Sequence, residues 1–194
     1  MICELKIKSI LGLDERRVVY GRKTTASTIT TDKKREFFEA NHIQGNGPSS
    51  YNIALYDECG TPIAVMGFIV SDSERIATLN RYATSCRVVG GFSKLLKYAI
   101  NHQPWTRIVS FADLRWSDGN LYETTGFTLE ATIPPDYYYT KGAELIHKFN
   151  FRHSRLPKIL GESYDPTMSE TENTKRSNWY QIFDCGKQRW VMNL

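Results

Sequence analysis

The chain has 194 residues, of which 41% are hydrophobic and 24% are charged, and its formal net charge is +4 at pH 7. This size and composition are typical of one globular domain with a hydrophobic core. No apolar run approaches the roughly 20 residues of a membrane-spanning helix, and the start MICELKIKSI lacks the apolar centre of a secretory signal. We therefore expect a cytoplasmic protein with no membrane partner. The mild positive charge permits a polyanionic partner without requiring one.

The cysteines are scattered along the chain, with no C-x-x-C pair and no histidine at metal-ligand spacing. This pattern favours reduced thiols over a disulfide framework or a zinc site. His147 and His153 are too loosely placed to predict a metal centre. We expect no metal site.

The N-terminal half predicts one helix and several strands. β-Branched residues predict a strand over 17–30, and Thr30 offers a cap for a helix over 33–41. Alternating apolar and polar residues predict two strands joined by a turn at 58–60, followed by a further strand over 75–83. Because the links between these strands are short, we expect them to form an antiparallel meander.

The middle of the chain predicts alternating strands and helices. In TSCRVVGGFSKLLKYAINH a glycine pair precedes apolar residues at helical spacing, which predicts a strand, a glycine loop and a helix. RIVSFAD then predicts a strand, NLYETTGF a short helix, and TLEATIP another strand. Strand, helix and strand in succession imply at least one parallel pair. We expect an α+β (mixed α/β) fold whose mixed central sheet has an antiparallel N-terminal meander and flanking helices.

The C-terminal part predicts two hairpins separated by a polar segment. DYYYTKGAELIHKFNFRHSRL predicts a hairpin, and the Ser-, Thr- and Glu-rich residues 161–178 predict a loop or linker. Two apolar-aromatic runs predict a final hairpin over 179–194. We expect residues 1–160 to form the main domain, with the final hairpin packed on it.

The glycine loop is a candidate anion site. Glycine permits close approach of the backbone, and the first N–H groups of a helix have no partner within it. The candidate cofactor-binding residues are Arg87, Val89, Gly90, Gly91, Ser93 and Lys94. A glycine pair before a helix is also common in an ordinary tight turn, so the alternative remains open.

The order of the motifs resembles the GNAT superfamily of acyl-CoA-dependent N-acyltransferases. The resemblance rests on antiparallel strands, an Arg-x-x-Gly loop, an amphipathic helix, a strand, and a helix with Leu-Tyr-x-x-x-Gly-Phe, over roughly residues 23–139. It implies a sheet with a splayed centre and acetyl-CoA or a related acyl donor. It also implies that Tyr122 protonates the departing thiolate. Phe92 occupies a position where the family has a small residue, so the loop differs here from the family's usual coenzyme A-binding loop.

A narrower resemblance points to Mom-type phage DNA-modification proteins and to a similar domain appended to phage homing endonucleases. The residues that carry it are NHIQG, RYATSCRVVGGFSKLLKY, SFADLRWSDGNLYETTGF, PDYYYTKG and IFDCG, in that order. It implies transfer of a small acyl-derived group to the exocyclic amine of adenine. DNA would then be a partner, and a phage-encoded chain would act in the host cytoplasm.

The stretch SFADLRWSDG carries further candidate residues. We expect Ser110 and Asp113 to point into the reaction cleft, and Arg115 and Trp116 to reach toward the acceptor. An exocyclic amine is a poor nucleophile, so a base must take its proton, and Asp113 is the candidate. A turn or helix cap explains Asp113 equally well.

Arg81 and His42 are further catalytic candidates. Arg81 can hold a carboxylate or phosphate through its planar fork, although an arginine on a strand is usually a solvated residue. The ordinary pKa of a histidine, about 6.5, suits His42 to proton exchange, although a lone histidine after a helix is more often structural.

The tyrosines and basic residues after Pro135 fit a nucleic-acid surface. We expect Tyr138 or a neighbour to pack in the sheet, and Tyr137 and Tyr139 to stack on an extruded base. The candidate phosphate contacts are Lys141, Lys148, Arg152 and Arg155. An ordinary solvated basic face is the alternative.

Three functions follow from these patterns. The first is a DNA-modifying N-acyltransferase, which Tyr122 and SFADLRWSDG favour. The second is a non-catalytic nucleic-acid-binding module, which Phe92 favours. The third is an N-acetyltransferase for a protein or small-molecule amine, which shares the same fold.

Overall fold

A computed structural model describes residues 2–71, 73 and 75–194 of the chain. The chain divides into two compact units. Unit 1 comprises Met1–Ala112, Trp116–Ala131 and Gln188–Leu194, and unit 2 comprises Asp113–Arg115 and Thr132–Lys187. Unit 2 is therefore mainly one insertion between two segments of unit 1.

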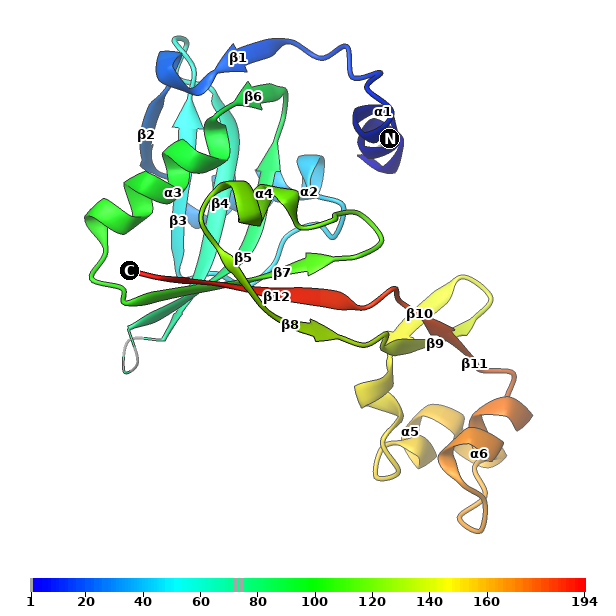
Figure 1. The fold of residues 1–194 in the computed structure, drawn as a ribbon. Helices are drawn as coiled ribbons and strands as arrows, with labels where there is room; N and C mark the ends of the chain where they lie inside the picture. Colours follow the sequence, from blue (N-terminus) through cyan, green and yellow to red (C-terminus); the bar gives the residue numbers. More distant parts are fainter. Residues whose placement is uncertain (1, 72, 74) are drawn as a thin grey trace. The chain divides into compact units, whose positions relative to one another are not determined.

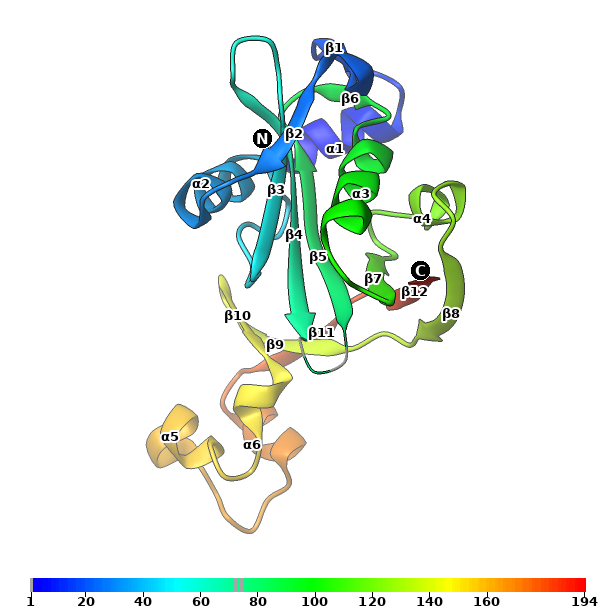
Figure 2. The ribbon, with the colours of Figure 1, turned by 90° about the vertical axis from the view of Figure 1, so that its left-hand side faces the viewer.

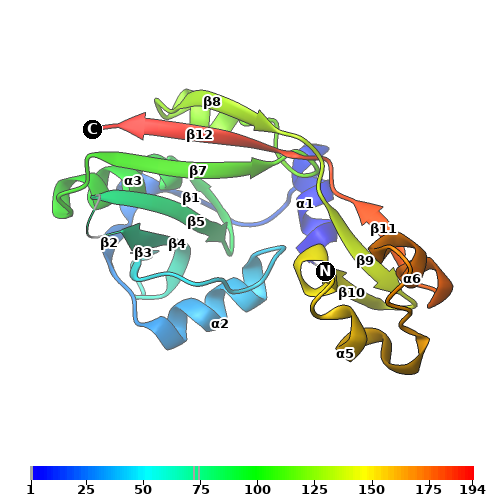
Figure 3. The ribbon, with the colours of Figure 1, turned by 90° about the horizontal axis from the view of Figure 1, so that it is seen from below.

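Unit 1 is built on a seven-stranded sheet (Figures 1 and 3). Its strands, in the order in which they lie, are β2 (Thr25–Thr28), β3 (Tyr51–Tyr56), β4 (Pro62–Ser71), β5 (Ile76–Thr84), β7 (Arg107–Asp113), β12 (Lys187–Asn193) and β8 (Thr128–Ile133). The first four pair antiparallel, and β5 pairs parallel with β7. The predicted mixed sheet with an antiparallel N-terminal meander is confirmed.

Helices cover both faces of this sheet (Figure 2). The helices of unit 1 are α1 (Ile2–Ile10), α2 (Thr31–Asn41), α3 (Gly91–His102) and α4 (Asn120–Thr124). Leu95, Leu96 and Ala99 repeat at helical spacing, so α3 buries one apolar stripe against the main core. α2 buries Phe37 and Phe38 in a second core on the opposite face. None of the described helices is long and apolar enough to cross a membrane.

The strand predicted over 17–30 is interrupted. It forms β1 (Val18–Tyr20), a 3₁₀ turn η1 (Gly21–Lys23) and β2. β1 leaves the main sheet and pairs parallel with β6 (Arg87–Val89), the strand that leads into the glycine loop. The sequence pattern does not reveal this change of partner, because both β1 and β2 are rich in β-branched residues.

β5 and β7 part halfway along their length. Their pairing runs from Ile76 opposite Arg107 to Leu79 opposite Ser110, after which β5 continues to Thr84. At the same point β5 has a bulge, because Phe68 lies opposite Leu79 and Gly67 lies opposite Arg81, which leaves Asn80 without a partner on β4. A bulge bends a strand and increases its twist. The predicted splayed centre therefore lies just beyond Leu79 and Ser110.

Unit 2 has its own sheet and core. Its elements are β9 (Tyr137–Lys141), β10 (Glu144–His147), η2 (Lys148–Phe151), α5 (Leu156–Leu160), η3 (Gly161–Ser163), α6 (Glu170–Arg176) and β11 (Tyr180–Phe183). β9 pairs antiparallel with both β10 and β11, which confirms the hairpin predicted from DYYYTKG onward. Tyr139, Phe151, Leu156 and Trp179 form the centre of its core.

Two features of the C-terminal part differ from the sequence prediction. The hairpin predicted over 179–194 does not form, because β11 pairs in the sheet of unit 2 and β12 in that of unit 1. The polar segment 161–178 contains α6, which begins at a capping box formed by Ser169 and Glu172. A Ser-x-x-Glu pattern was therefore present in the sequence, although the low hydrophobicity of the segment concealed it.

Candidate functional site

Ser110 and Tyr122 meet where β5 and β7 part. The Ser110 Oγ lies 3.0 Å from the carbonyl oxygen of Leu79 and 2.9 Å from the hydroxyl of Tyr122. A serine hydroxyl has one proton, so it donates to one of these oxygens at a time. When it donates to Leu79 it accepts the proton of Tyr122. When it donates to Tyr122, the tyrosine O–H is free to donate elsewhere.

The ring of Tyr122 is held by aromatic neighbours. It packs edge-on against Phe92 and Phe127 and is stacked near Trp190, with the centroids 5.9 Å apart. Burial raises the pKa of Tyr122 above its ordinary value, an effect that the hydrogen bond with Ser110 partly offsets. Tyr122 is therefore a neutral proton donor at pH 7, with its hydroxyl fixed at the parting of the strands.

A cavity of about 430 Å³ lies beside the unpaired half of β5. We call it the loop cavity, because the glycine loop, residues 87–93, forms much of its lining. Tyr82 and Thr84 line it from β5, and Leu121 and Thr124 line it from α4. The residue before Tyr122 therefore faces the loop cavity, while Tyr122 itself lies at the neighbouring splay.

The glycine loop presents free backbone donors to this cavity. Gly90, the residue before α3, adopts a left-handed conformation with φ of 72°, which glycine adopts at little cost. Among the described residues, no group accepts a hydrogen bond from the N–H of Gly91, Phe92 or Ser93. These are the N–H groups that a helix leaves unpaired, and together with the helix dipole they favour an anion.

Different contacts explain why residue 91 is a glycine and why residue 92 can be a phenylalanine. A Cβ on Gly91 would lie 2.7 Å from the Cγ1 of Val88, so a larger residue does not fit there. Phe92 is 4% exposed, and its ring packs edge-on against both Tyr82 and Tyr122. The side chain of Phe92 is therefore turned into the core, and it leaves the backbone N–H groups of the loop accessible.

The remaining predicted loop residues divide into two groups. Arg87 and Ser93 line the loop cavity. Val89 is exposed and pairs through its backbone with Tyr20 of β1. The Lys94 ammonium donates to the carbonyl oxygens of Gly21 and Thr24, which differs from the prediction that it binds the cofactor. Lys94 instead ties α3 to the N-terminal segment.

Asp113 does not share the site of Ser110. Side chains three positions apart on a strand point to opposite faces, and Ala112 and Ile108 place the even-numbered residues of β7 on the α3 side. Asp113 forms a two-point ion pair with Arg115, and these hydrogen bonds outweigh burial to lower its pKa. Strand alternation turns Asp113 to the face opposite Ser110, which disfavours the prediction that both point into one cleft.

Arg115 and Trp116 do not line the loop cavity, and their contact with an acceptor stays a prediction. Arg115 is occupied by Asp113 at 2.9 Å between Nη2 and Oδ2. Trp116 is half-buried in unit 1. The turn that follows them is fixed by Gly119, where a Cβ would overlap the ring of Trp190.

Arg81 lies on the α2 face of β5, one residue beyond the bulge at Asn80. Its Nη1 donates to the backbone and side-chain oxygens of Asn80, and its Nε points at the carbonyl of Gly45. Among the described residues, no carboxylate pairs with Arg81, and its Nη2 has no acceptor. Burial lowers the pKa of Arg81, which remains a cation at neutral pH. Its free edge can receive an anion or a carbonyl oxygen.

His42 is close to Arg81 but is a poor base. Its Nδ1 accepts the N–H of Gln44 at 3.1 Å, which places the proton of the neutral ring on Nε2. Burial, with smaller effects from Arg81 and Lys6, lowers the pKa of His42 to about 4. At pH 7 the ring is a neutral hydrogen-bond donor. This geometry disfavours the predicted role of His42 in accepting a proton.

The predicted nucleic-acid residues of unit 2 have mixed environments. Tyr139 is 1% exposed and its hydroxyl donates to Glu170, so the prediction that it stacks on a base is wrong. Tyr139 is the neighbour of Tyr138 that packs in the core of the unit, which confirms the prediction that one of these tyrosines is packed in the sheet. The Tyr137 ring lies beside Phe183, with the ammonium of Lys148 5.1 Å from its centre. Tyr137 is only half-buried.

The basic residues of unit 2 also differ from one another. Lys148 pairs with Asp136 at 2.6 Å, and the ammonium of Lys141 lies 6.0 Å from the ring of Trp179. Arg152 lies over the ring of Phe149 at 3.5 Å, and Arg155 lies 5.2 Å from the same ring. Among the described acidic residues, none pairs with either arginine. These arginines therefore keep their charge available.

The sequence interpretation missed several residues of the loop cavity. Ser9, Asp14 and Arg16 come from the N-terminal part of the chain, Thr124 from the end of α4 and Thr125 from the position after it. Arg16 and Arg17 precede the strand-like run VVY, so strand alternation offered one signal that they face opposite ways. Nothing in the sequence identified which of the two faces the loop.

Comparison with models of known protein families found no match, and comparison with curated protein sequences found none either. Solved structures do match. Spermidine/spermine N-acetyltransferase SpeG from Vibrio cholerae, in complex with manganese ions, matches with a TM-score of 0.52 at 11% identity, over 89% of this chain and 94% of that one. A variant of the spermidine N-acetyltransferase from the same organism gives 0.51 at 10% identity, over 89% and 94%.

Nourseothricin acetyltransferase gives a TM-score of 0.49 at 13% identity, over 88% of this chain and 98% of that one. At such identities the likeness concerns the fold alone, and we base it on the two structures above 0.5. The strand pair that parts beyond Leu79 and Ser110 and the glycine loop before α3 are features that the GNAT resemblance of the sequence implies. The chain therefore has the mixed, splayed fold of GNAT N-acetyltransferases.

Proposed function

We propose that the protein is an N-acyltransferase that takes an acyl group from a coenzyme A thioester and transfers it to an amine. The observation that carries this proposal is that the Tyr122 hydroxyl lies where β5 and β7 part, while its neighbour Leu121 and its ring partner Phe92 line the loop cavity. A proton donor at that point suits a reaction whose leaving group is a thiolate.

The loop cavity suits the phosphate groups of such a donor. The N–H groups of Gly91, Phe92 and Ser93 have no partner among the described residues, and Arg87 adds a positive charge. Gly91 leaves no room for a side chain, so the backbone stays open to a ligand. These residues fit a nucleotide thioester, which supplies the activated acyl group when it is bound.

Tyr122 would supply the proton that the thiolate needs. Its hydroxyl would donate the proton to the sulfur that leaves the acyl carbon as the amine nitrogen bonds to that carbon. The nitrogen loses one proton to solvent or to a base, so charge and atoms balance. Ser110 can then donate to the tyrosine oxygen, because its Oγ already lies 2.9 Å away. The raised pKa of Tyr122 ensures that it starts protonated.

The residues predicted to act as bases favour an acceptor amine that loses its proton without help from the protein. Asp113 is paired with Arg115 and has a lowered pKa, and the accepting nitrogen of His42 is already used by Gln44. An aliphatic amine keeps its lone pair on nitrogen, so its neutral form attacks without a dedicated base. This favours a small-molecule or protein amine as the acceptor. Arg81 and His42 would orient the acceptor as hydrogen-bond donors.

A nucleobase amine in DNA is the second candidate acceptor. It is favoured by the charges of Arg152, Arg155 and Lys158, which have no carboxylate partner among the described residues. The strand β11 also exposes Tyr180 and Phe183, each 59% exposed, and aromatic faces can stack on bases. The resemblance to Mom-type phage proteins supports the same acceptor. A non-catalytic nucleic-acid-binding module would use the same surface.

One experiment separates these functions. The purified chain is incubated with acetyl-CoA and, in separate reactions, a polyamine, a lysine peptide and duplex DNA. Thiol release is recorded, and products are identified by mass spectrometry, after digestion to nucleosides for DNA. An acetylated polyamine or peptide supports the first acceptor class, and a modified adenosine supports the second. DNA binding without thiol release in any reaction would favour the module and reject the enzyme.

A further inference from the structure

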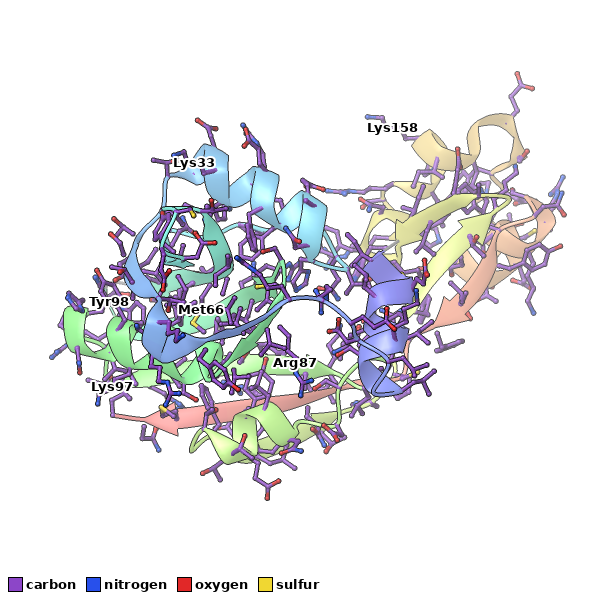
Figure 4. The ribbon with its side chains drawn as sticks, turned by 90° about the horizontal axis from the view of Figure 1, so that it is seen from above. Lys33, Met66, Arg87, Lys97, Tyr98 and Lys158 are labelled. Carbon is purple, nitrogen blue, oxygen red and sulfur yellow. The ribbon has the colours of Figure 1, made fainter. Side chains whose placement is uncertain are left out.

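The loop cavity has a wall that the glycine loop does not supply. Ser9 lines it from the last turn of α1, and Asp14 and Arg16 line it from the segment that follows. In Figure 4 the side chain of Arg87 lies beside this N-terminal segment. We propose that Arg16 is a second cationic ligand, with Arg87, for the phosphate groups of the donor. This inference rests on the proposed N-acyltransferase function.

The N-terminal segment is fixed to the glycine loop by its backbone. Val18 lies opposite Arg87 in the parallel pair of β1 and β6, and the N–H of Arg87 donates to the carbonyl of Arg17 at 3.0 Å. Gly21 packs on Gly90 so closely that a Cβ on Gly21 would lie 3.2 Å from the Gly90 backbone. Lys94 adds hydrogen bonds to the carbonyls of Gly21 and Thr24. Arg16 therefore has a defined position relative to the free N–H groups of the loop.

The guanidinium of Arg16 is held with an open edge. Asp14 accepts from its Nε at 2.9 Å and from its Nη2 at 2.7 Å, and Nη1 lies 3.4 Å from the carbonyl oxygen of Thr84. Five N–H groups are available on an arginine, so two remain for a ligand after these contacts. An arginine held in this way loses less conformational entropy when it binds phosphate. Its side chain is 27% exposed, which leaves it reachable from the cavity.

The charges that face the loop cavity balance in favour of an anion. Arg16 and Arg87 contribute two positive charges, and Asp14 contributes one negative charge. The hydrogen bonds from Arg16 and the nearby charge of Arg87 lower the pKa of Asp14 to about 2, so its carboxylate remains charged at pH 7. If Arg87 were the only cation in the lining, the negative charge of Asp14 would cancel its positive charge. The second arginine is what makes the lining suitable for a polyanion.

Arg17 provides a matched control in the next position. Its side chain is 61% exposed and pairs with Asp57 at 2.9 Å, away from the lining of the loop cavity. Arg16→Gln and Arg17→Gln remove the same charge from the same segment. Only the first removes a group from the cavity. Arg16→Lys keeps the charge and removes the planar fork.

The test is the dissociation constant of free coenzyme A, measured by titration calorimetry at fixed ionic strength for these variants. We expect Arg16→Gln to raise it at least about tenfold, as for the loss of a charge-assisted phosphate contact. Arg16→Lys should lie between Arg16→Gln and wild type, and Arg17→Gln within twofold of wild type. Melting temperatures identify any variant whose fold has been weakened.

The outcomes separate the inference from the function on which it rests. If wild type binds coenzyme A and Arg16→Gln binds it equally well, Arg16 is not a ligand and the proposed function stands. If Arg16→Gln and Arg17→Gln weakened coenzyme A binding equally, the cause would be the lower net charge of the protein. That result would also overturn the inference. If wild type binds no coenzyme A, the proposed function fails and the inference fails with it.

Discussion

The Ser110 Oγ lies 2.9 Å from the Tyr122 hydroxyl and 3.0 Å from the Leu79 carbonyl oxygen, at the last pair of residues that join β5 to β7. Twelve positions separate the serine from the tyrosine, and the turn at Gly119 and the short helix α4 bring them together. The strand pairing therefore ends at a proton donor. This relationship underlies the proposed chemistry and most of the predictions below.

Ser110→Ala should lower the rate of acyl transfer without preventing folding. Tyr122 would lose the group that can donate to its oxygen as its proton leaves. We expect kcat to fall about tenfold, with little change in the dissociation constant of coenzyme A. Because the hydrogen bond from Ser110 lowers the pKa of Tyr122, its removal should move any alkaline limb of the rate profile to higher pH. A limb that moves to lower pH would contradict this account.

Gly119→Ala should destabilise unit 1 strongly. Gly119 has φ of 86°, and a Cβ there would overlap the ring of Trp190, which is 6% exposed. Backbone strain and overpacking together should cost about 3 kcal/mol, measured by urea unfolding. Gly60→Ala is the control, because Gly60 has φ of 74° but open space around it. Its cost should be only about 1 kcal/mol, and equal losses for the two variants would refute the packing argument.

His42 should make the protein less stable in acid. Its pKa is lowered in the folded state to about 4, from an ordinary value of 6.5, so the unfolded chain binds more protons between these values. Stability is therefore lost as pH falls from about 6.5 to 4. For a partly exposed ring we expect about 1–2 kcal/mol, less than the full shift implies.

The check on His42 is a comparison of unfolding free energies at pH 7 and pH 4. His42→Gln removes the titrating ring, so its loss of stability over this range should be smaller than that of wild type by about the same 1–2 kcal/mol. Other acidic groups titrate equally in both proteins and cancel. An identical pH dependence would show that the His42 ring titrates normally.

Arg81→Gln should affect the acceptor and not the donor. Arg81 lies on the α2 face with a free Nη2, whereas the loop cavity is lined by the glycine loop and the end of β5. We expect the KM for the amine to rise about tenfold, while the dissociation constant of coenzyme A stays within twofold of wild type. Arg35→Gln, an exposed residue of α2 that pairs with Asp32, is the control. If Arg81→Gln weakened the binding of coenzyme A and left the KM for the amine unchanged, Arg81 would contact the donor and this prediction would be wrong.

The sequence was informative where a pattern is local. The amphipathic stripe of α3, the glycine pair before it and the short links of the first strands predicted the architecture of unit 1 correctly. The pairing of Ser110 with Tyr122 could not be predicted, because it depends on how α4 returns over the sheet. Ser110 and Asp113 both lie near the end of one predicted strand, although strand alternation turns their side chains to opposite faces.

The other differences between the sequence predictions and the structure arise from contacts between residues that are far apart in the sequence. Lys94 follows the glycine loop and resembles a phosphate ligand, but its ammonium donates to the carbonyl oxygens of Gly21 in η1 and of Thr24, the residue after η1. β11 and β12 are separated by a glycine turn with hairpin character, yet each strand finds its partner elsewhere. The N-terminal segment could not be assigned to the loop cavity from the sequence, because its position depends on the parallel pairing of β1 with β6. The paired residues, such as Val18 and Arg87, are far apart in the sequence.

The most direct test of the proposed chemistry is the turnover of acetyl-CoA by wild type, Tyr122→Phe and Tyr98→Phe, with the acceptor amine identified by the product analysis. Tyr122→Phe keeps the ring among Phe92, Phe127 and Trp190 and removes only the hydroxyl. Tyr98 stacks on His102, outside the lining of the loop cavity, and serves as the matched control. We expect kcat to fall at least about a hundredfold in Tyr122→Phe and to stay within twofold in Tyr98→Phe. Wild-type turnover by Tyr122→Phe would contradict the account.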